Sequence, residues 1–470
     1  MAVDAAWWSL IDDPARVVDL RQPDSLNYLL NRYGERRQHV LAEVLGQAYA
    51  AGAQSAVIEF RYIDADYRDE HSRFYSTTFR RYPSVVHRVH FFAQALTDQV
   101  ADPDEALEFS DLDYLGYIVM RPVPGAPVGR VMLTRPAELR ESITCWGTDR
   151  VNLFGEFLDI DGTPFLAQDA QLMRCAHAAL WVVARHHNLR WAAPKLLPRD
   201  IVDAVPKESA AGRAVPSPGL TVSQMSAAAS KLGLPPLVYD LEDLPGRETL
   251  QRIACRYLNS GLPVIVAGGG HAFVLVGYRR TMEGTPDERL EFIRQDDEAG
   301  PYQLVADFAF DTYAPWKYFI VPLPPKLYIA GEEAEVLGEA WLKAAFARDG
   351  IPLNPPENYS YRTTAMPSND FKSAVLSRGV PTKQAAVLRR SPMPRWIWVV
   401  ELVDRRLRKE GKPAVLGETI IDATDHARDR RPLAWRTPRS VAVLAPDTRT
   451  VSAASVSTPT PPIQFASQGR

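Results

Sequence analysis

Hydrophobic and polar residues follow several patterns along the chain, beginning with a mixture of helix-like and strand-like segments. Over residues 26–48, apolar side chains recur every three or four positions, which predicts an amphipathic helix. Residues 55–62 and 114–120 have the apolar runs of strands, and residues 128–133, which follow a Pro-Gly-Ala-Pro turn, predict a hairpin. We therefore expect residues 1–150 to form an N-terminal α/β domain without catalytic residues.

The middle of the chain contains its longest apolar segments. A polar lead-in ends at Cys175, and the residues that follow are almost all apolar, which predicts a helix buried on most of its faces. Residues 261–278 predict two strands joined by a glycine turn, with His271 at the start of the second strand. This segment is about as long as a membrane span, but its three consecutive glycines and its histidine favour the strand interpretation. A further strand is expected over residues 290–294.

The last third of the chain changes pattern after a cluster of prolines. A helix is expected over residues 332–348, and strands over residues 396–402 and 415–421, which together predict a C-terminal α+β unit. The Pro- and Ser-rich stretch at residues 206–220 predicts a surface loop. The final residues have no periodicity and predict disorder. The expected domains are residues 1–150, 151–325 and 326–447, followed by a disordered tail at 448–470.

Composition and charge narrow the possible functions. The chain has 470 residues, of which 46% are hydrophobic and 24% charged, as in a globular protein with several domains. Its 54 Lys and Arg residues nearly balance 57 Asp and Glu residues, so no basic surface for nucleic acid is expected. Residues 1–14 lack the basic start of a secretory signal. We expect a cytoplasmic protein with no cofactor, no metal, no membrane contact and no nucleic-acid partner.

Three cysteines, too few and too scattered for a disulfide framework or a zinc knuckle, include one candidate nucleophile. They are Cys145, Cys175 and Cys255. At the start of a buried helix, unpaired backbone N–H groups and the helix dipole would stabilise a thiolate at Cys175. Gln168 or Gln171 could supply a side-chain amide to an oxyanion hole. The alternative is that Cys175 is a small buried apolar residue, as most free cysteines are.

The base for Cys175 must come from another part of the chain. His177 faces away from Cys175 on the same helix, and His186 and His187 lie about three turns further along. None of these three histidines is well placed to take the proton of the thiol.

His271 is the strongest candidate for the base, because a strand mounts it rigidly. If the next strand pairs with this one in antiparallel fashion, the turn that contains Asp296 and Asp297 returns beside the histidine. Either carboxylate could then bind Nδ1–H of the imidazole and fix its tautomer. The alternative is a core histidine with one structural hydrogen bond, next to a solvated acidic turn.

Other groups of polar residues that could ligate a metal are better explained by structural roles. Asp422, Asp425 and His426 could ligate a metal, but a strand end followed by a polar turn explains the same residues. His87 and His90 have no further ligands near them in the sequence, so we expect them to serve packing.

The order of the candidate residues resembles that of the papain-like cysteine peptidases, in particular the branch that processes bacteriocin precursors with double-glycine leaders. Five blocks match in the family's order, over about residues 165–320, roughly a third of the chain. They are Gln168 to Cys175 with Ala179 and Leu180, residues 219–233, 261–266, 271–278 and 296–300. The resemblance implies an α+β protein with a papain-like cysteine peptidase core, flanked by an N-terminal α/β domain and a C-terminal α+β domain.

The resemblance also implies a role for each candidate residue. Cys175 would be the nucleophile, His271 the general base and Gln168 the oxyanion donor. Asp296 would orient the base, with Asp297 as the alternative. The expected function is cleavage of a peptide or isopeptide bond in a protein or peptide substrate. An export role is not implied, because the transporter that accompanies many bacteriocin-processing peptidases is not part of this chain.

Two departures from the family keep other functions open. Ala176 stands where the family has glycine, and the segment from Gln168 to Cys175 is one residue longer than expected. These departures motivate a second hypothesis, a catalytically silent binding or regulatory module. A cysteine acyltransferase or deamidase on the same core is a further alternative, and the accessory domains could regulate such an enzyme.

Overall fold

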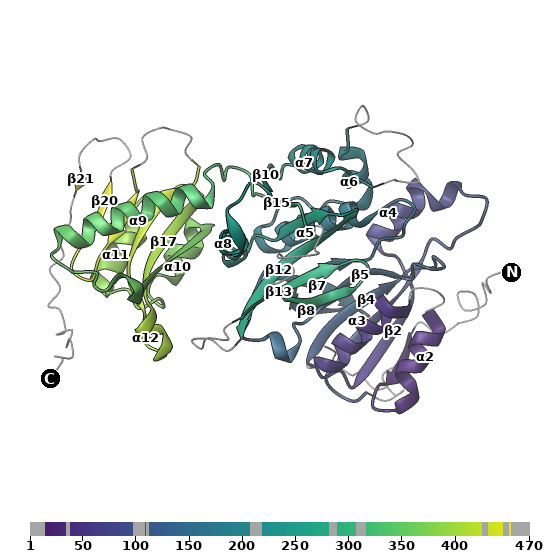
Figure 1. The fold of residues 1–470 in the computed structure, drawn as a ribbon. Helices are drawn as coiled ribbons and strands as arrows, with labels where there is room; N and C mark the ends of the chain where they lie inside the picture. Colours follow the sequence, from purple (N-terminus) through teal and green to yellow (C-terminus); the bar gives the residue numbers. More distant parts are fainter. Residues whose placement is uncertain are drawn as a thin grey trace. The chain divides into compact units, whose positions relative to one another are not determined.

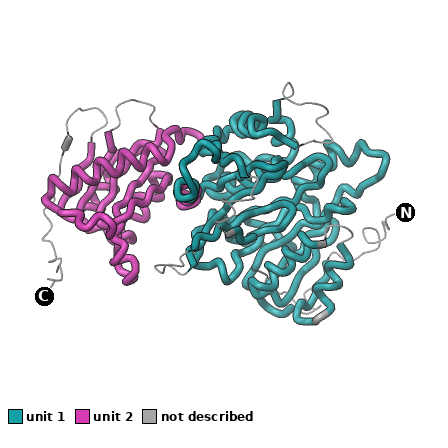
Figure 2. The backbone as a smooth tube through the Cα atoms, viewed as in Figure 1, with its two compact units in different colours: residues 1–251, 261–324 teal, residues 252–260, 325–470 magenta. Residues whose placement is uncertain are grey.

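The computed structural model describes residues 15–33, 38–96, 109, 112–206, 219–281, 289–306, 316–424, 431–444 and 451–452. Its helices and antiparallel sheets confirm the α+β class. The chain divides into two compact units (Figure 2). Unit 1 consists of residues 1–251 and 261–324, and unit 2 of residues 252–260 and 325–470.

A six-stranded antiparallel sheet forms the N-terminal part of unit 1 (Figure 1). The strands expected at residues 55–62, 114–120 and 128–133 are confirmed as three of its members. One member, Val86–Phe92, lacks the alternating pattern because both of its faces are buried. In spatial order the strands are β1 (Ala15–Asp19), β2 (Ser55–Tyr62), β3 (Val86–Phe92), β4 (Tyr114–Met120), β5 (Val128–Leu133) and β9 (Phe165–Leu166).

Two helices occupy the segment in which the periodicity predicts one. The single helix expected over residues 26–48 is wrong, because the structure has α2 (Pro23–Tyr33) and α3 (Gln38–Ala50). Gly34, a poor helix former, follows α2 in the sequence. Apolar residues of both helices face one core. The apolar positions therefore recur across both helices as they would in a single amphipathic helix. A third helix, α4 (Ala65–Arg73), and the short helices η1 (Tyr75–Thr77) and η4 (Ala137–Leu139) complete this part.

His271 and Asp296 lie on strands of a seven-stranded antiparallel sheet. Its main path is β10 (Pro236–Asp240), β15 (Tyr318–Pro322), β11 (Val264–Gly268), β12 (His271–Thr281), β13 (Arg289–Asp296) and β14 (Gly300–Ala306), and β6 (Ile143–Thr144) also pairs with β12. Val274 of β12 lies opposite Gln295 of β13. The turn after β13 therefore returns beside His271, as expected. A separate hairpin joins β7 (Gly147–Leu153) to β8 (Glu156–Gly162).

Helix α5 (Cys175–Trp191) packs against β12 in the interior of unit 1 (Figure 1). Every residue from 176 to 187 is buried, which confirms the prediction of a helix covered on most of its faces. One continuous hydrophobic core contains residues of α2, α3, the first sheet, α5 and the second sheet. Among the described residues, unit 1 also contributes to α6 (Pro198–Ala204), α7 (Val222–Lys231) and α8 (Gly246–Asn259).

Hydrogen bonds between buried polar groups also tie α5 to the N-terminal part. Trp181 Nε1 donates to Asp66 at 3.3 Å, and Arg185 Nη2 donates to Asp149 at 2.8 Å. Buried polar groups without partners destabilise a fold, so these pairs fix the helix relative to the strands around it.

Unit 2 is built on a six-stranded antiparallel sheet whose strands lie in sequence order. The helix and two strands expected in this region are confirmed as α9 (Gly331–Arg348), β17 (Trp396–Asp404) and β18 (Val415–Asp422). The strands are β16 (Tyr359–Pro367), β17 (Trp396–Asp404), β18 (Val415–Asp422), β19 (Ala434–Arg436), β20 (Val441–Leu444) and β21 (Val451–Ser452). The helices are α9 (Gly331–Arg348), η7 (Pro356–Asn358), α10 (Ser368–Ala374), α11 (Thr382–Arg390) and α12 (Arg405–Lys409).

Several sequence predictions fall wholly or mostly outside the described residues. The loop expected at 206–220 has only residues 206, 219 and 220 described. In the segment expected to be a tail, only Val451 and Ser452 are described, and they pair with β20. Among the described residues, no helix is both long and apolar enough to cross a bilayer.

Candidate active site

Cys175 is the first residue of α5 and is half-buried. The first backbone N–H groups of a helix lack partners within it, and the positive end of the helix dipole lies there. Both features stabilise a thiolate. Because residues 176–187 of α5 are all buried, the position of Cys175 is fixed by the core.

Asp169 organises the loop before Cys175, a role that the sequence analysis did not assign to it. Its Oδ1 accepts hydrogen bonds from the backbone N–H groups of Gln171 at 3.1 Å and Met173 at 2.8 Å. The Tyr75 hydroxyl donates to Oδ2 at 2.5 Å. Aspartates often bind backbone N–H groups a few residues ahead, so the local signal was present in the sequence. The contact with Tyr75 spans 94 positions and had no local signal.

The three histidines of α5 serve structural roles. The backbone N–H of Arg174 donates to His177 Nδ1 at 3.3 Å, so His177 caps the helix. Burial lowers the pKa of His177 and of His186 to about 4, and it holds the pKa of His187 well below its usual value. All three are neutral near pH 7. This agrees with the expectation that none of them is the base for Cys175.

His271, the first residue of β12, contacts both Cys175 and Asp296. The turn before it runs through Gly269 and Gly270, whose φ angles of 55° and 84° favour glycine. Nε2 of the ring lies 3.0 Å from Oδ1 of Asp296, and the Cys175 side chain lies close enough to the ring to raise its pKa. The expectation that the carboxylate binds Nδ1 is therefore wrong. Nε2, at the tip of the ring, reaches Asp296 at the end of the neighbouring strand β13.

Asp296 is held ionised by its neighbours. Burial by itself would raise its pKa, but the hydrogen bond from His271 and the charge of Arg294 outweigh burial and keep the pKa below its usual value. Arg294 Nη1 lies 2.9 Å from Oδ2, and the guanidinium lies over the Phe273 ring, 5.0 Å from its centroid. The backbone N–H of Glu298 donates to Oδ1 at 3.0 Å.

The same contacts keep His271 protonated at neutral pH. Its hydrogen bond to Asp296, followed by the one to Cys175, raises its pKa to about 10 despite partial burial. A protonated imidazole next to a thiol at a helix N-terminus is the environment in which a cysteine becomes a reactive thiolate. The arrangement can therefore support nucleophilic chemistry.

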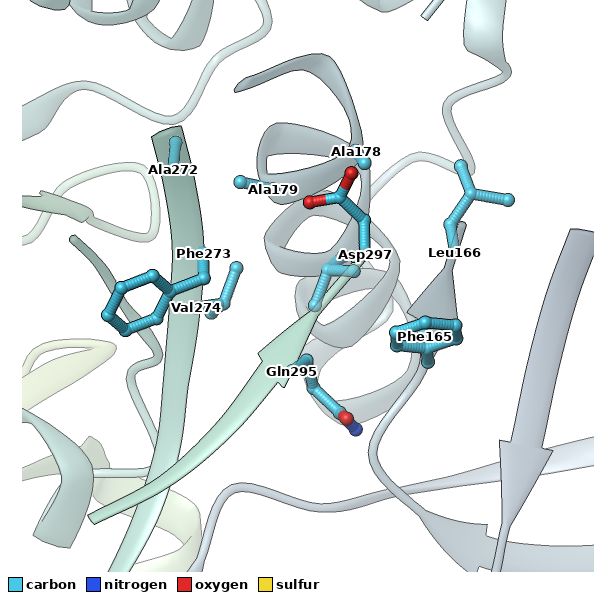
Figure 3. Close-up of a pocket in the computed structure, with 10 residues that line it drawn as sticks. Phe165, Leu166, Ala178, Ala179, Ala272, Phe273, Val274, Gln295 and Asp297 are labelled. Atoms are coloured by element: carbon cyan, nitrogen blue, oxygen red, sulfur yellow. The ribbon is translucent and has the colours of Figure 1, made fainter. Parts of the chain in front are cut away.

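Asp297 has a different environment from its neighbour. Only 5% of the residue is exposed, and its Oδ2 has no hydrogen-bond partner among the described residues. Burial raises its pKa to about 7. Its side chain lies between α5 and β12, where it lines a small cavity together with Ala179 and Val274 (Figure 3). Of the two aspartates, Asp296 is the one bonded to His271.

The two candidate oxyanion donors also differ. Gln168 is buried, and its Nε2 donates to Oε1 of Glu298 at 3.1 Å, two residues after Asp296. Gln171 is exposed to solvent. The structure therefore brings Gln168 to the acidic turn, where its amide is bound to a carboxylate. His39 of α3 borders the same turn, with Nε2 2.6 Å from the carbonyl oxygen of Glu298.

His271, Asp296 and Asp297 are also the only group of potential metal ligands found among the described residues, with ligand atoms within 4.8 Å of one another. However, Nε2 of His271 and Oδ1 of Asp296 are bonded to each other, and Arg294 already supplies positive charge at Oδ2 of Asp296. This set fits a hydrogen-bonded network better than a metal centre.

The other groups weighed from the sequence have structural contacts. Asp422 Oδ1 accepts two hydrogen bonds from the turn that follows it, whereas Asp425 and His426 lie outside the described residues. His87 and His90 are buried in β3, where each bonds a tyrosine hydroxyl, at 2.9 and 2.8 Å. The expectation that these two histidines serve packing is confirmed.

No model of a known protein family matches the chain, and no curated protein is significantly similar to it. The functional argument therefore depends on the residues of this chain and on their geometry.

Proposed function

We propose that unit 1 contains a papain-like cysteine peptidase core in which Cys175, His271 and Asp296 form a catalytic triad. The observation that carries this proposal is the continuous line of contacts from the thiol through the imidazole ring to the carboxylate. The nucleophile lies at the start of a buried helix, and the other two residues lie on paired strands. The resemblance of the sequence to papain-like peptidases supports the same roles. The substrate is a protein or peptide with an accessible peptide or isopeptide bond.

In this proposal the Cys175 thiolate attacks the carbonyl carbon of the scissile bond. The backbone N–H of Cys175 and the amide of Gln168 stabilise the negative charge that develops on the carbonyl oxygen. His271 gives its Nδ1 proton to the leaving amine as the C–N bond breaks, and a thioester remains. Neutral His271 then takes a proton from the water that attacks the thioester, and release of the acid restores the thiolate and imidazolium. Asp296 holds Nε2 throughout and fixes the ring.

Thiol alkylation tests the ion pair without a substrate. At about pH 6, we expect iodoacetamide to modify Cys175 at least ~10-fold faster than the half-buried Cys255, because the thiolate is the reactive form. The His271→Ala variant should lose this difference. Cys145 is fully buried, and burial raises its pKa, so its modification reports unfolding. Peptide mass spectrometry measures all three rates in one sample.

Hydrolysis of a peptide library tests the reaction itself. Wild type and a Cys255→Ala control should cleave the same peptides, and Cys175→Ala should cleave none. Equal cleavage by wild type and Cys175→Ala would contradict the proposal.

A binding or regulatory module is the second candidate function. Two observations favour it: Ala176 replaces the family's glycine, and the Gln168 amide is engaged by the Glu298 carboxylate rather than left open. Alkylation of Cys175 no faster than that of Cys255 would support this function over the peptidase. Fast alkylation, accompanied by amine incorporation or ammonia release in place of hydrolysis, would instead indicate an acyltransferase or a deamidase on the same core.

A further inference from the structure

Asp297 is a buried acid at the candidate site to which the proposed reaction assigns no role. Its Oδ2 is buried without a hydrogen-bond partner among the described residues, and its side chain lines a small cavity whose other lining residues include Ala178, Ala179 and Val274 (Figure 3). A carboxyl group in such surroundings is costly to ionise, because no donor replaces its lost hydration. A residue that is only structural would be expected to satisfy both of its oxygens.

The charges near Asp297 come from a small set of groups. His271 faces it from β12, and Asp296 and Glu298 face it from its own turn. Ligand atoms of His271, Asp296 and Asp297 lie within 4.8 Å of one another. Cys175 of α5 adjoins this cluster, close enough to His271 to raise the pKa of its ring. A change of charge on Asp297 therefore acts directly on the imidazolium.

Asp296 and Asp297 differ in their charged partners and in their pKa values. Arg294 pairs with Oδ2 of Asp296, which stays ionised, whereas burial raises the pKa of Asp297 to about 7. Neighbouring carboxyl groups with such different environments can take separate roles in one site. Asp296 holds the ring of His271, and the charge of Asp297 is free to change near neutral pH.

We propose that Asp297 is a positioning residue that extends to higher pH the range over which the Cys175–His271 ion pair persists. When Asp297 is ionised, its carboxylate adds a second negative charge beside the imidazolium and so opposes loss of the ring proton. When Asp297 is protonated, this contribution is absent. The inference rests on the proposed pairing of Cys175 with His271, but it does not depend on which substrate is cleaved.

Titration of the His271 ring by NMR tests this role in the full-length chain. The ring resonances are assigned from their absence in His271→Ala. In Asp297→Asn, we expect the imidazolium of His271 to lose its proton about one pH unit lower than in wild type. The pH profile of the Cys175 alkylation rate should change at a correspondingly lower pH on its alkaline side. The charge-preserving Asp297→Glu variant should return the titration towards that of wild type, because it restores a carboxylate at this position.

The controls separate this inference from the proposed function. Asp243→Asn, at an exposed position of unit 1, should leave the His271 titration unchanged. Wild type itself supplies a second measurement: the His271 resonances should move in a small step near pH 7, when Asp297 ionises. Fast, His271-dependent alkylation of Cys175 with no such step, or with an unchanged titration in Asp297→Asn, would overturn the inference alone. Slow alkylation of Cys175 in wild type would overturn the proposed function and this inference together.

Discussion

Asp296 and Asp297 are adjacent in the sequence but differ in charge because each contacts different groups. Asp296 receives hydrogen bonds from His271 and from the Glu298 backbone, and it pairs with Arg294. Asp297 is directed into apolar surroundings, and its Oδ2 has no partner among the described residues. At neutral pH the first carboxyl is ionised, and the second is close to the midpoint of its titration.

The buried carboxyl of Asp297 should make stability depend on pH. Between about pH 4 and 7, the folded chain keeps a proton on Asp297 that the unfolded chain has lost, so stability falls as the pH rises through this window. Asp297→Asn lacks this titration. Its unfolding free energy should rise relative to that of wild type across the window and exceed it by roughly 2–4 kcal/mol above pH 7.

Urea denaturation of wild type and Asp297→Asn at several pH values measures this difference. Asp243→Asn serves as the exposed control and should follow the wild-type curve. A difference between Asp297→Asn and wild type that stays constant from pH 4 to 8 would contradict the prediction.

Asp296 and Asp297 also show which contacts cannot be predicted from residue identity alone. The sequence identified both aspartates and His271 as candidates, because a strand end followed by an acidic turn is a local pattern. Which carboxylate meets the ring depends on the antiparallel register of β12 and β13. Which nitrogen it meets depends on the distance between these strands and on Cys175 from α5. These contacts join residues far apart in the chain.

At the scale of elements, α5 and the loop before it form one support for Cys175. The helix was predictable because residues 176–184 are apolar except for His177, and such a segment must be buried. The loop was not predictable in the same way, because its conformation depends on Asp169 and on the distant Tyr75.

Removing the Asp169 side chain should loosen this support. Asp169→Ala leaves the backbone N–H groups of Gln171 and Met173 without their acceptor, so we expect a loss of roughly 2–4 kcal/mol of stability and slower alkylation of Cys175. The control is Asp161→Ala in β8, whose exposed carboxylate accepts from Thr148. It should cost less than about 0.5 kcal/mol. Thermal denaturation and alkylation rates provide the two measurements, and equal behaviour of the variants would refute the role of Asp169.

Other elements show where periodicity misleads. β3 has both faces buried and so lacks alternation, and the apolar spacing over residues 26–48 continues across two helices. In both cases the pattern records which side chains reach the core. It does not record whether the backbone between them is continuous.

At the scale of the whole molecule, each unit has its own network of buried contacts. The core of unit 1 extends from the first sheet through α5 to the second sheet. Unit 2 includes residues 252–260, where Arg256 pairs with Glu332 at 2.8 Å and Glu335 at 2.8 Å. The α8 segment that supplies Arg256 is separated from the rest of unit 2 by residues 261–324, so no local pattern assigns it there.

Unit 2 should depend strongly on this buried arginine. Arg256 is 6% exposed, and Arg256→Ala leaves the two glutamates without their buried partner, so we expect a loss of roughly 3–5 kcal/mol. Arg252, one turn earlier, also pairs with Glu335 but is 68% exposed, and Arg252→Ala should cost at most about 1 kcal/mol. Denaturation followed by hydrogen–deuterium exchange of peptides from unit 2 distinguishes the two variants. Similar losses for both would refute the assignment.

The sequence by itself determined the elements that carry the site and the types of residue available there. The helix that starts at Cys175 and the strands that carry His271 and Asp296 follow from local hydrophobic patterns, because the burial of each element is recorded in its own residues. The tertiary structure decided that Nε2 meets Asp296, that Asp297 is buried without a partner for Oδ2 among the described residues, and that Gln168 binds Glu298. These outcomes depend on distances between segments far apart in the chain, and such distances are set only when the segments pack together.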